Sequence, residues 1–216
     1  MYGGALKRIR QLVRKPTAVR AGMLDLLRLC AKAVPSPVWS RFRKLDFERD
    51  QQSLSTWLRK LLKSEPPPTS ITGLCFGLFN PILKDGKPTS CLYLAGSERF
   101  ERRLKNPDWA CDPEYFPEGR YSSSKVLTKI YRDANAAIYS DANVPAEVGA
   151  QAELALCLGY SCLVVADWCR GPLRPALFGD APLRGVAVGF DSGDLVLIDV
   201  LRSALQKDRK GSSKNR

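Results

Sequence analysis

Three consecutive prolines, Pro66 to Pro68, divide the chain into two parts with different apolar periodicities. Proline has no amide hydrogen and its ring clashes with the preceding helical turn, so a helix does not continue through such a run. Before the prolines, apolar residues recur at helical spacing; after them, short apolar runs are separated by turn residues. Because helices and strands come in blocks, we predict an α+β fold with a mostly antiparallel sheet.

The part before the prolines predicts helices. Residues 51–63 give the cleanest helical pattern, in which one face carries all the large apolar residues: Leu54, Trp57, Leu58, Leu61 and Leu62. A second helix is predicted over residues 21–34, ending at the Pro35-Ser36-Pro37 run. A short basic amphipathic helix precedes Pro16.

The part after the prolines predicts two β-hairpins with helices between them. Residues 72–79 and 90–95 flank the turn signal Asp85-Gly86, and residues 184–190 and 195–201 flank the turn 191–194. Helices are predicted over residues 122–138 and from Pro145 to at least Cys157. Residues 161–168 fit either a buried helix or a strand. We therefore expect two hairpins packed against helices, with an N-terminal helical arm.

Positive charge is concentrated at the two ends of the chain. Residues 1–65 hold 15 Lys and Arg against 5 Asp and Glu, residues 66–206 hold 14 against 16, and the last ten residues hold 5 against 1. We predict a basic helical arm over residues 1–48, a globular domain over residues 49–206 and a disordered basic tail over residues 207–216.

The chain contains no histidine, which excludes a Ser-His-Asp triad, a Cys-His pair and imidazole metal ligands. The phosphate-binding patterns G-x-x-x-x-G-K-[ST] and G-x-G-x-x-G are also absent. None of the seven cysteines forms a C-x-x-C pair, so we interpret them as buried free thiols in a reducing compartment rather than zinc ligands. We predict no metal and no cofactor.

Residues 96–121 form the most unusual stretch, a predicted long loop in which aromatic and charged residues are interleaved. Long loops in compact domains are often functional. One interpretation is a partner-binding surface with aromatic anchors and charged specificity groups. The other is an ordered loop whose aromatic residues fill the core. The candidate partner-binding residues are Glu98, Arg99, Trp109, Asp112, Tyr115 and Phe116.

The basic segment at residues 1–20 has three interpretations. It is a helix packed on the domain, a contact for nucleic acid or an anionic membrane surface, or a targeting peptide. The candidate anion-binding residues are Lys7, Arg8, Arg10, Arg14 and Lys15. No transmembrane segment is predicted, because the uncharged run 154–166 is shorter than the roughly 20 residues that a bilayer requires.

Two groups of aspartates also have alternative interpretations. Asp191 and Asp194 flank a glycine turn and fit ordinary turn chemistry better than a Ca²⁺ site or a catalytic pair. Asp167 lies in an apolar run, and if it is buried it requires a partner such as Arg170 or Arg174.

Four short stretches resemble uncharacterised bacterial proteins, some of which are similar to the immunity proteins that neutralise polymorphic toxins. The resemblance covers roughly residues 70–200 and rests on Gly96-Ser97-Glu98-Arg99-Phe100, Trp109-Ala110-Cys111, Tyr115-Phe116-Pro117 and Gly189-Phe190-Asp191-Ser192-Gly193-Asp194. It carries over no functional residue. Many immunity proteins that neutralise basic nucleases are acidic, whereas this chain is basic at both ends.

These observations predict a cytoplasmic protein-binding module of an immunity-like kind, with a protein as its partner. A module attached to nucleic acid or an anionic membrane through the basic segment is one alternative. A histidine-free enzyme that uses carboxylates such as Glu98, Asp112 or Asp167 is another. The sequence does not indicate an oligomeric state.

Overall fold

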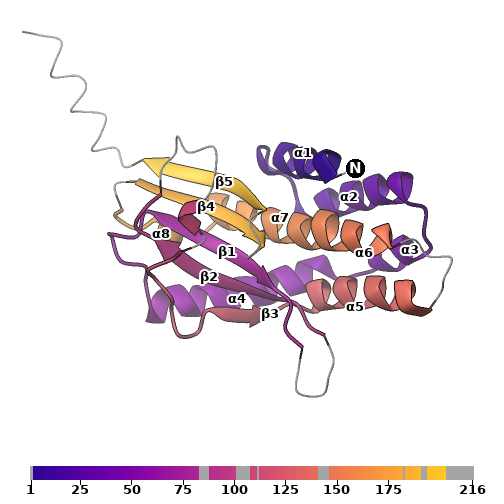
Figure 1. The fold of residues 1–216 in the computed structure, drawn as a ribbon. Helices are drawn as coiled ribbons and strands as arrows, with labels where there is room; N and C mark the ends of the chain where they lie inside the picture. Colours follow the sequence, from indigo (N-terminus) through magenta and orange to yellow (C-terminus); the bar gives the residue numbers. More distant parts are fainter. Residues whose placement is uncertain are drawn as a thin grey trace, which may run out of the picture.

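The computed structural model describes residues 2–82, 88–100, 108–110, 112–140, 146–181, 183–190 and 194–202. The predicted turns at Asp85-Gly86 and 191–193, Cys111 and the predicted tail 207–216 lie outside the described residues. Figure 1 shows a sheet on one side of the molecule and the helices gathered beside and behind it.

Four helices precede the proline run: α1 (Tyr2–Val13), α2 (Val19–Ala33), α3 (Val38–Phe42) and α4 (Phe47–Ser64). Asp46 caps α4, where its side chain accepts a 3.1 Å hydrogen bond from the backbone N–H of Arg49. The helix ends at Ser64, just before the prolines. The helices predicted over residues 21–34 and 51–63 therefore correspond to α2 and α4.

The sheet contains five strands: β1 (Gly73–Phe79), β2 (Cys91–Ser97), β3 (Tyr121–Ser123), β4 (Leu183–Phe190) and β5 (Leu195–Arg202). Their order is β3-β2-β1-β4-β5. The pairs β1–β2, β2–β3 and β4–β5 are antiparallel, whereas β1 and β4 are parallel. The α+β prediction is confirmed, and the sheet is mixed but mostly antiparallel.

The parallel pairing of β1 with β4 requires a long crossover, since parallel neighbours cannot be joined by a tight turn. The helices between β3 and β4 lie within that crossover: α5 (Lys125–Ser140), α6 (Glu147–Gln151), the π-helical stretch η2 (Ala152–Leu158), α7 (Gly159–Arg170) and α8 (Arg174–Phe178). The segment 161–168, which fitted helix or strand, is helical and lies in α7.

Residues 147–170 form one continuous helical stretch with a mean hydropathy of 1.6 in its most apolar window. Among the described residues it is the one stretch long and apolar enough to cross a bilayer, although the uncharged run within it is only 13 residues long. Of that window, 83% is buried inside the protein, which is typical of a core helix.

The N-terminal helices contribute to the same hydrophobic core as the rest of the chain. Ile9 and Leu26 are fully buried and pack at Gly159 of α7. A Cβ atom at Gly159 would lie 2.3 Å from Leu26 Cδ1, so glycine permits the close approach of α2 and α7. The apolar faces of α1 and α2 are therefore covered by α7 and η2.

Candidate functional site

The two faces of the sheet differ in side-chain size. On the helix side, β1 presents Leu74, Phe76 and Leu78, all buried. On the opposite side, which we call the open face, the alternate residues of β1 and β4 are small, apart from Phe79 at the end of β1 and Leu183 at the start of β4. The open face includes Gly73, Cys75, Gly77 and Phe79 of β1, Tyr93 of β2, Tyr121 of β3, Leu183, Gly185, Ala187 and Gly189 of β4, and Leu195 and Leu197 of β5.

Glycines on the open face allow aromatic rings to lie directly on the strands. A Cβ atom at Gly77 would fall 2.0 Å from Tyr93 Cζ, and one at Gly73 would fall 2.4 Å from Trp109 Cζ3. Gly185 is covered in the same way by Phe100, at 2.3 Å. Any residue with a Cβ would displace these rings. The alternating glycines of β1 and β4 are thus the sequence signal for this arrangement.

Part of the segment that follows β2 covers one end of the open face. Phe100 and Trp109, which lies in the short 3₁₀ helix η1 (Asp108–Ala110), pack edge-to-face with centroids 5.2 Å apart. Both are buried together with Cys75 and Ala187. Trp109, a candidate partner-binding residue, therefore points into the protein.

Tyr115 is anchored to the end of α4. Its hydroxyl donates a 2.6 Å hydrogen bond to the carbonyl of Glu65. Burial, together with the nearby Glu65 carboxylate, raises the pKa of Tyr115 to about 12. This side chain is half-buried and holds the segment to the helix layer.

The charged candidates Glu98, Arg99 and Asp112 gather in one exposed cluster. Arg99 forms ion pairs with Asp112 at 2.8 Å and with Glu114 at 2.9 Å. The hydrogen bond from Arg99 to Asp112 raises the arginine pKa, and the backbone N–H of Glu98, 3.0 Å from Glu114 Oε2, lowers the pKa of Glu114. The structure thus brings these three residues together, in a cluster whose carboxylates outnumber its one arginine.

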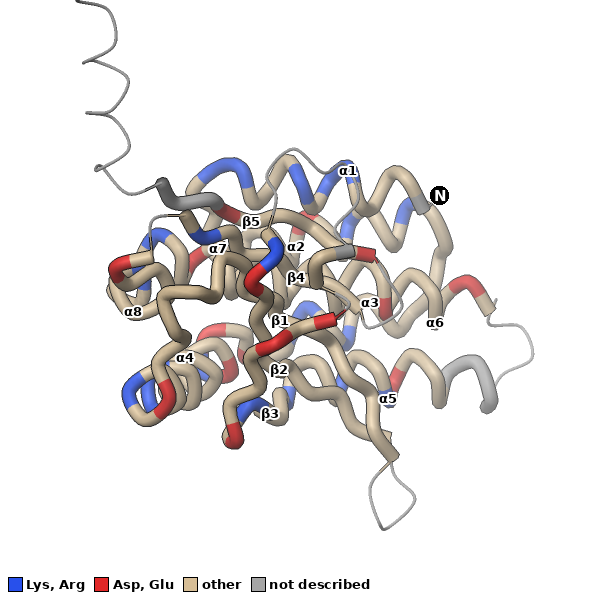
Figure 2. The backbone as a smooth tube through the Cα atoms, turned by 60° about the vertical axis from the view of Figure 1, so that its left-hand side comes forward, with Lys and Arg blue, Asp and Glu red and all other residues tan. Residues whose placement is uncertain are grey.

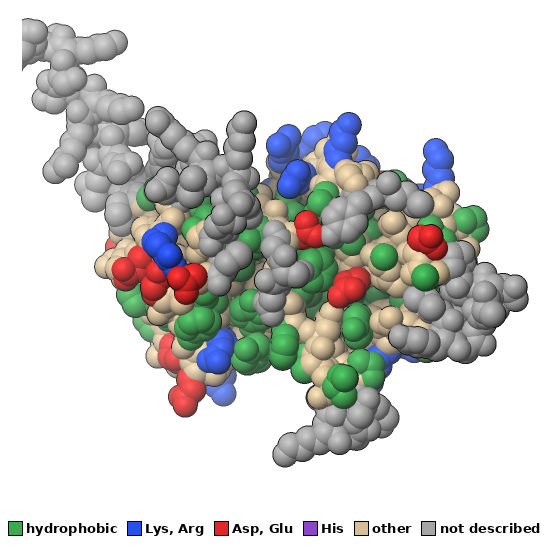
Figure 3. Space-filling model, viewed as in Figure 1, with side chains coloured by type: hydrophobic (Ala, Val, Ile, Leu, Met, Phe, Trp, Pro, Cys, Tyr) green, Lys and Arg blue, Asp and Glu red, His purple; other side chains and the backbone are tan. Residues whose placement is uncertain are grey.

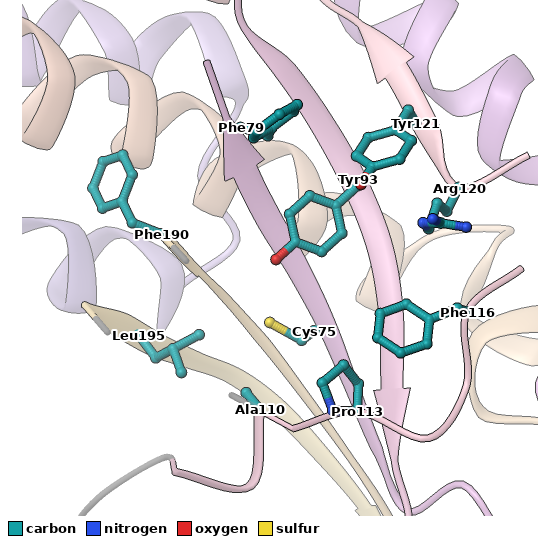
Figure 4. A pocket seen from close by; sticks show the side chains of 10 residues that line it. All are labelled: Cys75, Phe79, Tyr93, Ala110, Pro113, Phe116, Arg120, Tyr121, Phe190 and Leu195. Carbon is teal, nitrogen blue, oxygen red and sulfur yellow. The ribbon is translucent and has the colours of Figure 1, made fainter. Parts of the chain in front are cut away.

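At the other end of the open face lies a hollow of about 270 Å³ (Figure 4). It lies between the strands and the segment that leads into β3. The ring of Tyr121 packs against those of Phe79 and Tyr93, with ring centroids 5.8 and 5.6 Å apart. We call these three rings the aromatic wall of the hollow. The residues that line the hollow are Cys75, Phe79, Tyr93, Ala110, Pro113, Phe116, Arg120, Tyr121, Phe190 and Leu195.

Arg120 lies beside this hollow between two aromatic rings. Its guanidinium carbon is 5.0 Å from the ring centroid of Tyr121 and 5.5 Å from that of Phe116. Such cation–π contacts orient a guanidinium without neutralising its charge. Neither Arg120 nor Tyr121 was among the six candidate partner-binding residues, although both lie at the end of the predicted loop 96–121.

The large hydrophobic side chains that remain exposed are concentrated on this side of the protein. Among the described residues, they are Phe79, Phe116, Tyr121 and Leu197, each 40% to 53% exposed, and Ile82, just after β1. Figure 3 shows hydrophobic side chains gathered over the strands on this face. Of the six candidate partner-binding residues, Phe116 is the one that contributes an exposed ring to this group.

Of the candidate anion-binding residues, Lys7, Arg8 and Arg10 lie in α1, and Arg14 and Lys15 directly follow it; Figure 2 shows Lys and Arg positions along this helix. Lys7, Arg10, Arg14 and Lys15 are exposed, and none of the ion pairs described involves them. Arg8 differs, because it forms an ion pair with Asp25 of α2 at 2.6 Å. The hydrogen bond from Arg8 lowers the pKa of Asp25.

The three carboxylates considered for catalysis do not converge. Glu98 and Asp112 belong to the exposed Arg99 cluster, whereas Asp167 lies on α7 and accepts a 2.8 Å hydrogen bond from Gln51. Asp167 is exposed rather than buried, and its described partner is Gln51 instead of Arg170 or Arg174. None of the three lines either hollow described.

A second hollow of about 570 Å³ lies between α4 and the start of α5, lined by Asp46, Arg49, Asp50, Lys125 and Lys129 among others. The Asp50 carboxylate at its base already accepts hydrogen bonds from Ser124, Lys125 and Tyr160. Within the described part of the chain, no group of three or more Cys, Asp and Glu residues could hold a metal ion.

No protein-family model matches this chain, and neither the curated proteins nor the solved structures contain a significant match to it. Its function must therefore be inferred from the arrangement of its own residues.

Proposed function

We propose that this protein is a protein-binding module whose partner docks on the open face of the sheet, beside the segment 112–121. The observation that carries the proposal is the concentration of exposed Phe79, Phe116 and Tyr121 around Arg120. Contiguous exposed apolar surface marks interaction sites, and aromatic and arginine side chains are enriched among the residues that dominate binding energy.

The neighbouring Arg99 cluster suits the rim of such an interface. Its ion pairs are exposed and contribute little to stability. Rim charges instead set the orientation of the partner and the rate of association. The buried Trp109 and the half-buried Tyr115 hold this segment on the sheet and serve the site by positioning it.

Site-specific photo-cross-linking tests the proposal. A benzophenone amino acid at position 121 should capture a specific protein from a lysate of the native host, and one at exposed position 59 of α4 should not. A second experiment places the cross-linker at position 79. In that protein, Tyr121→Ala combined with Phe116→Ala should reduce capture of the partner by at least about tenfold. Equal capture at positions 59 and 121 would contradict the proposal.

Within this proposal, an immunity-like role means that the partner is a toxic protein that the module neutralises in the cytoplasm, a compartment that keeps thiols reduced. Co-expression with the product of a neighbouring gene tests that role. If the neighbour is toxic, the wild-type chain should restore growth and the Tyr121→Ala, Phe116→Ala variant should not. Rescue by both chains alike would exclude the open face as the neutralising surface.

The exposed cations of α1 and of the two residues after it favour a second candidate function, attachment to an anionic surface. Because Ala5, Ile9 and Val13 are buried against the core, α1 has no apolar face left to insert into a bilayer. Attachment through α1 would therefore be electrostatic and would weaken steeply with salt. Exchanging Lys7, Arg10, Arg14 and Lys15 for Gln should abolish binding to duplex DNA at low salt. Unchanged binding would exclude this candidate.

A further inference from the structure

We infer that the hollow beside Arg120 binds one acidic residue of the partner, with its carboxylate on the Arg120 guanidinium and a neighbouring apolar side chain against the aromatic wall. This inference rests on the proposed function and specifies the chemistry of the partner. It follows from the size of the hollow and from the hydrogen bonds and aromatic contacts of Arg120.

The size of the hollow limits what it accepts. Sites for cofactors and drug-sized ligands usually enclose about 300 to 1,000 Å³. This hollow, at about 270 Å³, falls just below that range and is open to the surface of the sheet. It suits one or two side chains of a docking segment better than a complete small-molecule ligand.

Among the described residues that line the hollow, Arg120 is the one that carries a charge. In the described part of the chain the Arg120 guanidinium forms no ion pair. The hydrogen bond described for its side chain is a long one, 3.4 Å from Nη1 to the carbonyl oxygen of Pro117. A guanidinium carries five N–H donors in a planar fork that matches a carboxylate. Most of these donors are therefore available to a ligand.

The aromatic contacts of Arg120 prepare it for this role. Tyr121 and Phe116 both lie within cation–π distance of the guanidinium, so the side chain is held at the mouth of the hollow before any partner arrives. A preoriented group loses less conformational entropy on binding. By contrast, Arg99 at the other end of the segment already binds two carboxylates.

The local chemistry, rather than the charge of the whole chain, points to an acidic residue. The formal net charge of +12 belongs to residues 1–65 and the last ten residues, whereas residues 66–206, which contain the hollow, hold 14 Lys and Arg against 16 Asp and Glu. The preference for a carboxylate therefore rests on the Arg120 guanidinium and the uncharged residues around it. An acidic residue flanked by apolar side chains would satisfy both the guanidinium and the aromatic wall.

Two matched peptides test the inference: N-acetyl-Trp-Glu-Trp-amide and N-acetyl-Trp-Gln-Trp-amide, which differ only in the carboxylate. Binding is followed by ¹⁹F NMR of the full chain labelled with 3-fluorotyrosine, with the Tyr93 and Tyr121 signals assigned from Phe substitutions. We expect the Glu peptide to shift both signals and to bind about five- to tenfold more tightly than the Gln peptide at low salt.

Variants separate the guanidinium from general charge. Arg120→Gln should remove the preference for the Glu peptide, and Arg120→Lys should retain only part of it because the planar fork is lost. Arg59→Gln, an exposed position on α4, should leave the preference unchanged, and circular dichroism should show that each variant is folded.

Equal binding of the two peptides, or a preference that survives Arg120→Gln, would overturn the inference. That result would leave cross-linking at position 121 unaffected, so the proposed function could still hold. Loss of specific cross-linking at position 121 with the peptide preference intact would instead count against the proposed function alone.

Discussion

Tyr160 of α7 donates a 2.9 Å hydrogen bond to the buried carboxylate of Asp50 in α4. The same carboxylate accepts hydrogen bonds from the Ser124 hydroxyl at 2.5 Å and the backbone N–H of Lys125 at 2.7 Å, at the start of α5. Burial and the nearby Asp50 raise the pKa of Tyr160, so its phenol stays protonated as the donor. One acidic residue thus connects three helices.

Removing this acceptor should destabilise the fold. Asp50→Ala leaves two buried donors and one part-buried donor without their partner, and we expect the free energy of unfolding to fall by about 3 kcal/mol. Tyr160→Phe should cost about 1.5 kcal/mol, since it removes one hydrogen bond to a charged group. Urea denaturation measures both. Asp180→Ala, at an exposed carboxylate, should change stability by less than about 0.5 kcal/mol; a similarly small effect of Asp50→Ala would contradict this assignment.

Arg184→Met should also be strongly destabilising. Arg184 is 1% exposed, and its guanidinium donates hydrogen bonds to four backbone carbonyls, those of Pro68, Ile71, Leu177 and Phe178. Burial lowers the pKa of Arg184. Methionine fills similar space without the donors, so we expect a loss of about 3 kcal/mol, measured by urea denaturation. Arg59→Met at an exposed position is the control. If Arg184→Met and Arg59→Met were equally stable, the hydrogen bonds from Arg184 to these carbonyls would not contribute to the stability of the fold.

Gly77→Ala should displace Tyr93 from the sheet. The added Cβ would lie 2.0 Å from Tyr93 Cζ, and overpacking of this kind costs about 1 to 3 kcal/mol. In a Tyr93→Ala background the same substitution should cost much less, so a double-mutant cycle should show coupling. Gly4→Ala in α1, where the added Cβ would meet nothing within 4 Å beyond its own stretch of helix, is the control and should not destabilise the protein. Additive costs in the cycle would mean that Tyr93 does not rest on Gly77.

Glu153→Gln should stabilise the protein at neutral pH. Glu153 lies in the π-helical stretch η2 and accepts a 2.9 Å hydrogen bond from Asn80. Burial raises its pKa above the ordinary 4.5, so the folded state holds this proton more tightly than the unfolded state does. The stability contributed by Glu153 is therefore complete below pH 4.5 and is lost as pH rises through the raised pKa.

Urea denaturation at a series of pH values from 4 to 8 measures this effect. The stability advantage of the Gln variant over the wild type should grow as pH rises from about 4.5 and then level off. Glu147→Gln, an exposed carboxylate in α6, serves as the control. A stability advantage of the Gln variant that stays constant from pH 4 to 8 would contradict the raised pKa of Glu153.

The sequence alone determined the local elements and the general class of the fold. The apolar spacing of residues 51–63 and the prolines at 66–68 are local signals, because a helix buries one stripe and a proline stops it whatever lies around it. The α+β class followed from the order of these elements, and the lack of histidine excluded imidazole chemistry through composition alone.

Only the tertiary structure decided which side chains of the candidate site face a partner. Trp109 and Phe116 lie in the same aromatic segment, yet Trp109 is 6% exposed over Gly73 and Phe116 is 53% exposed beside Arg120. That difference in exposure depends on the pairing of β1 with β4. In this pairing Gly77 lies opposite Gly189, although the two residues are far apart in the sequence. Local periodicity contains no information about such distant pairs, so the open face and the place of Arg120 exist only once the strands are assembled.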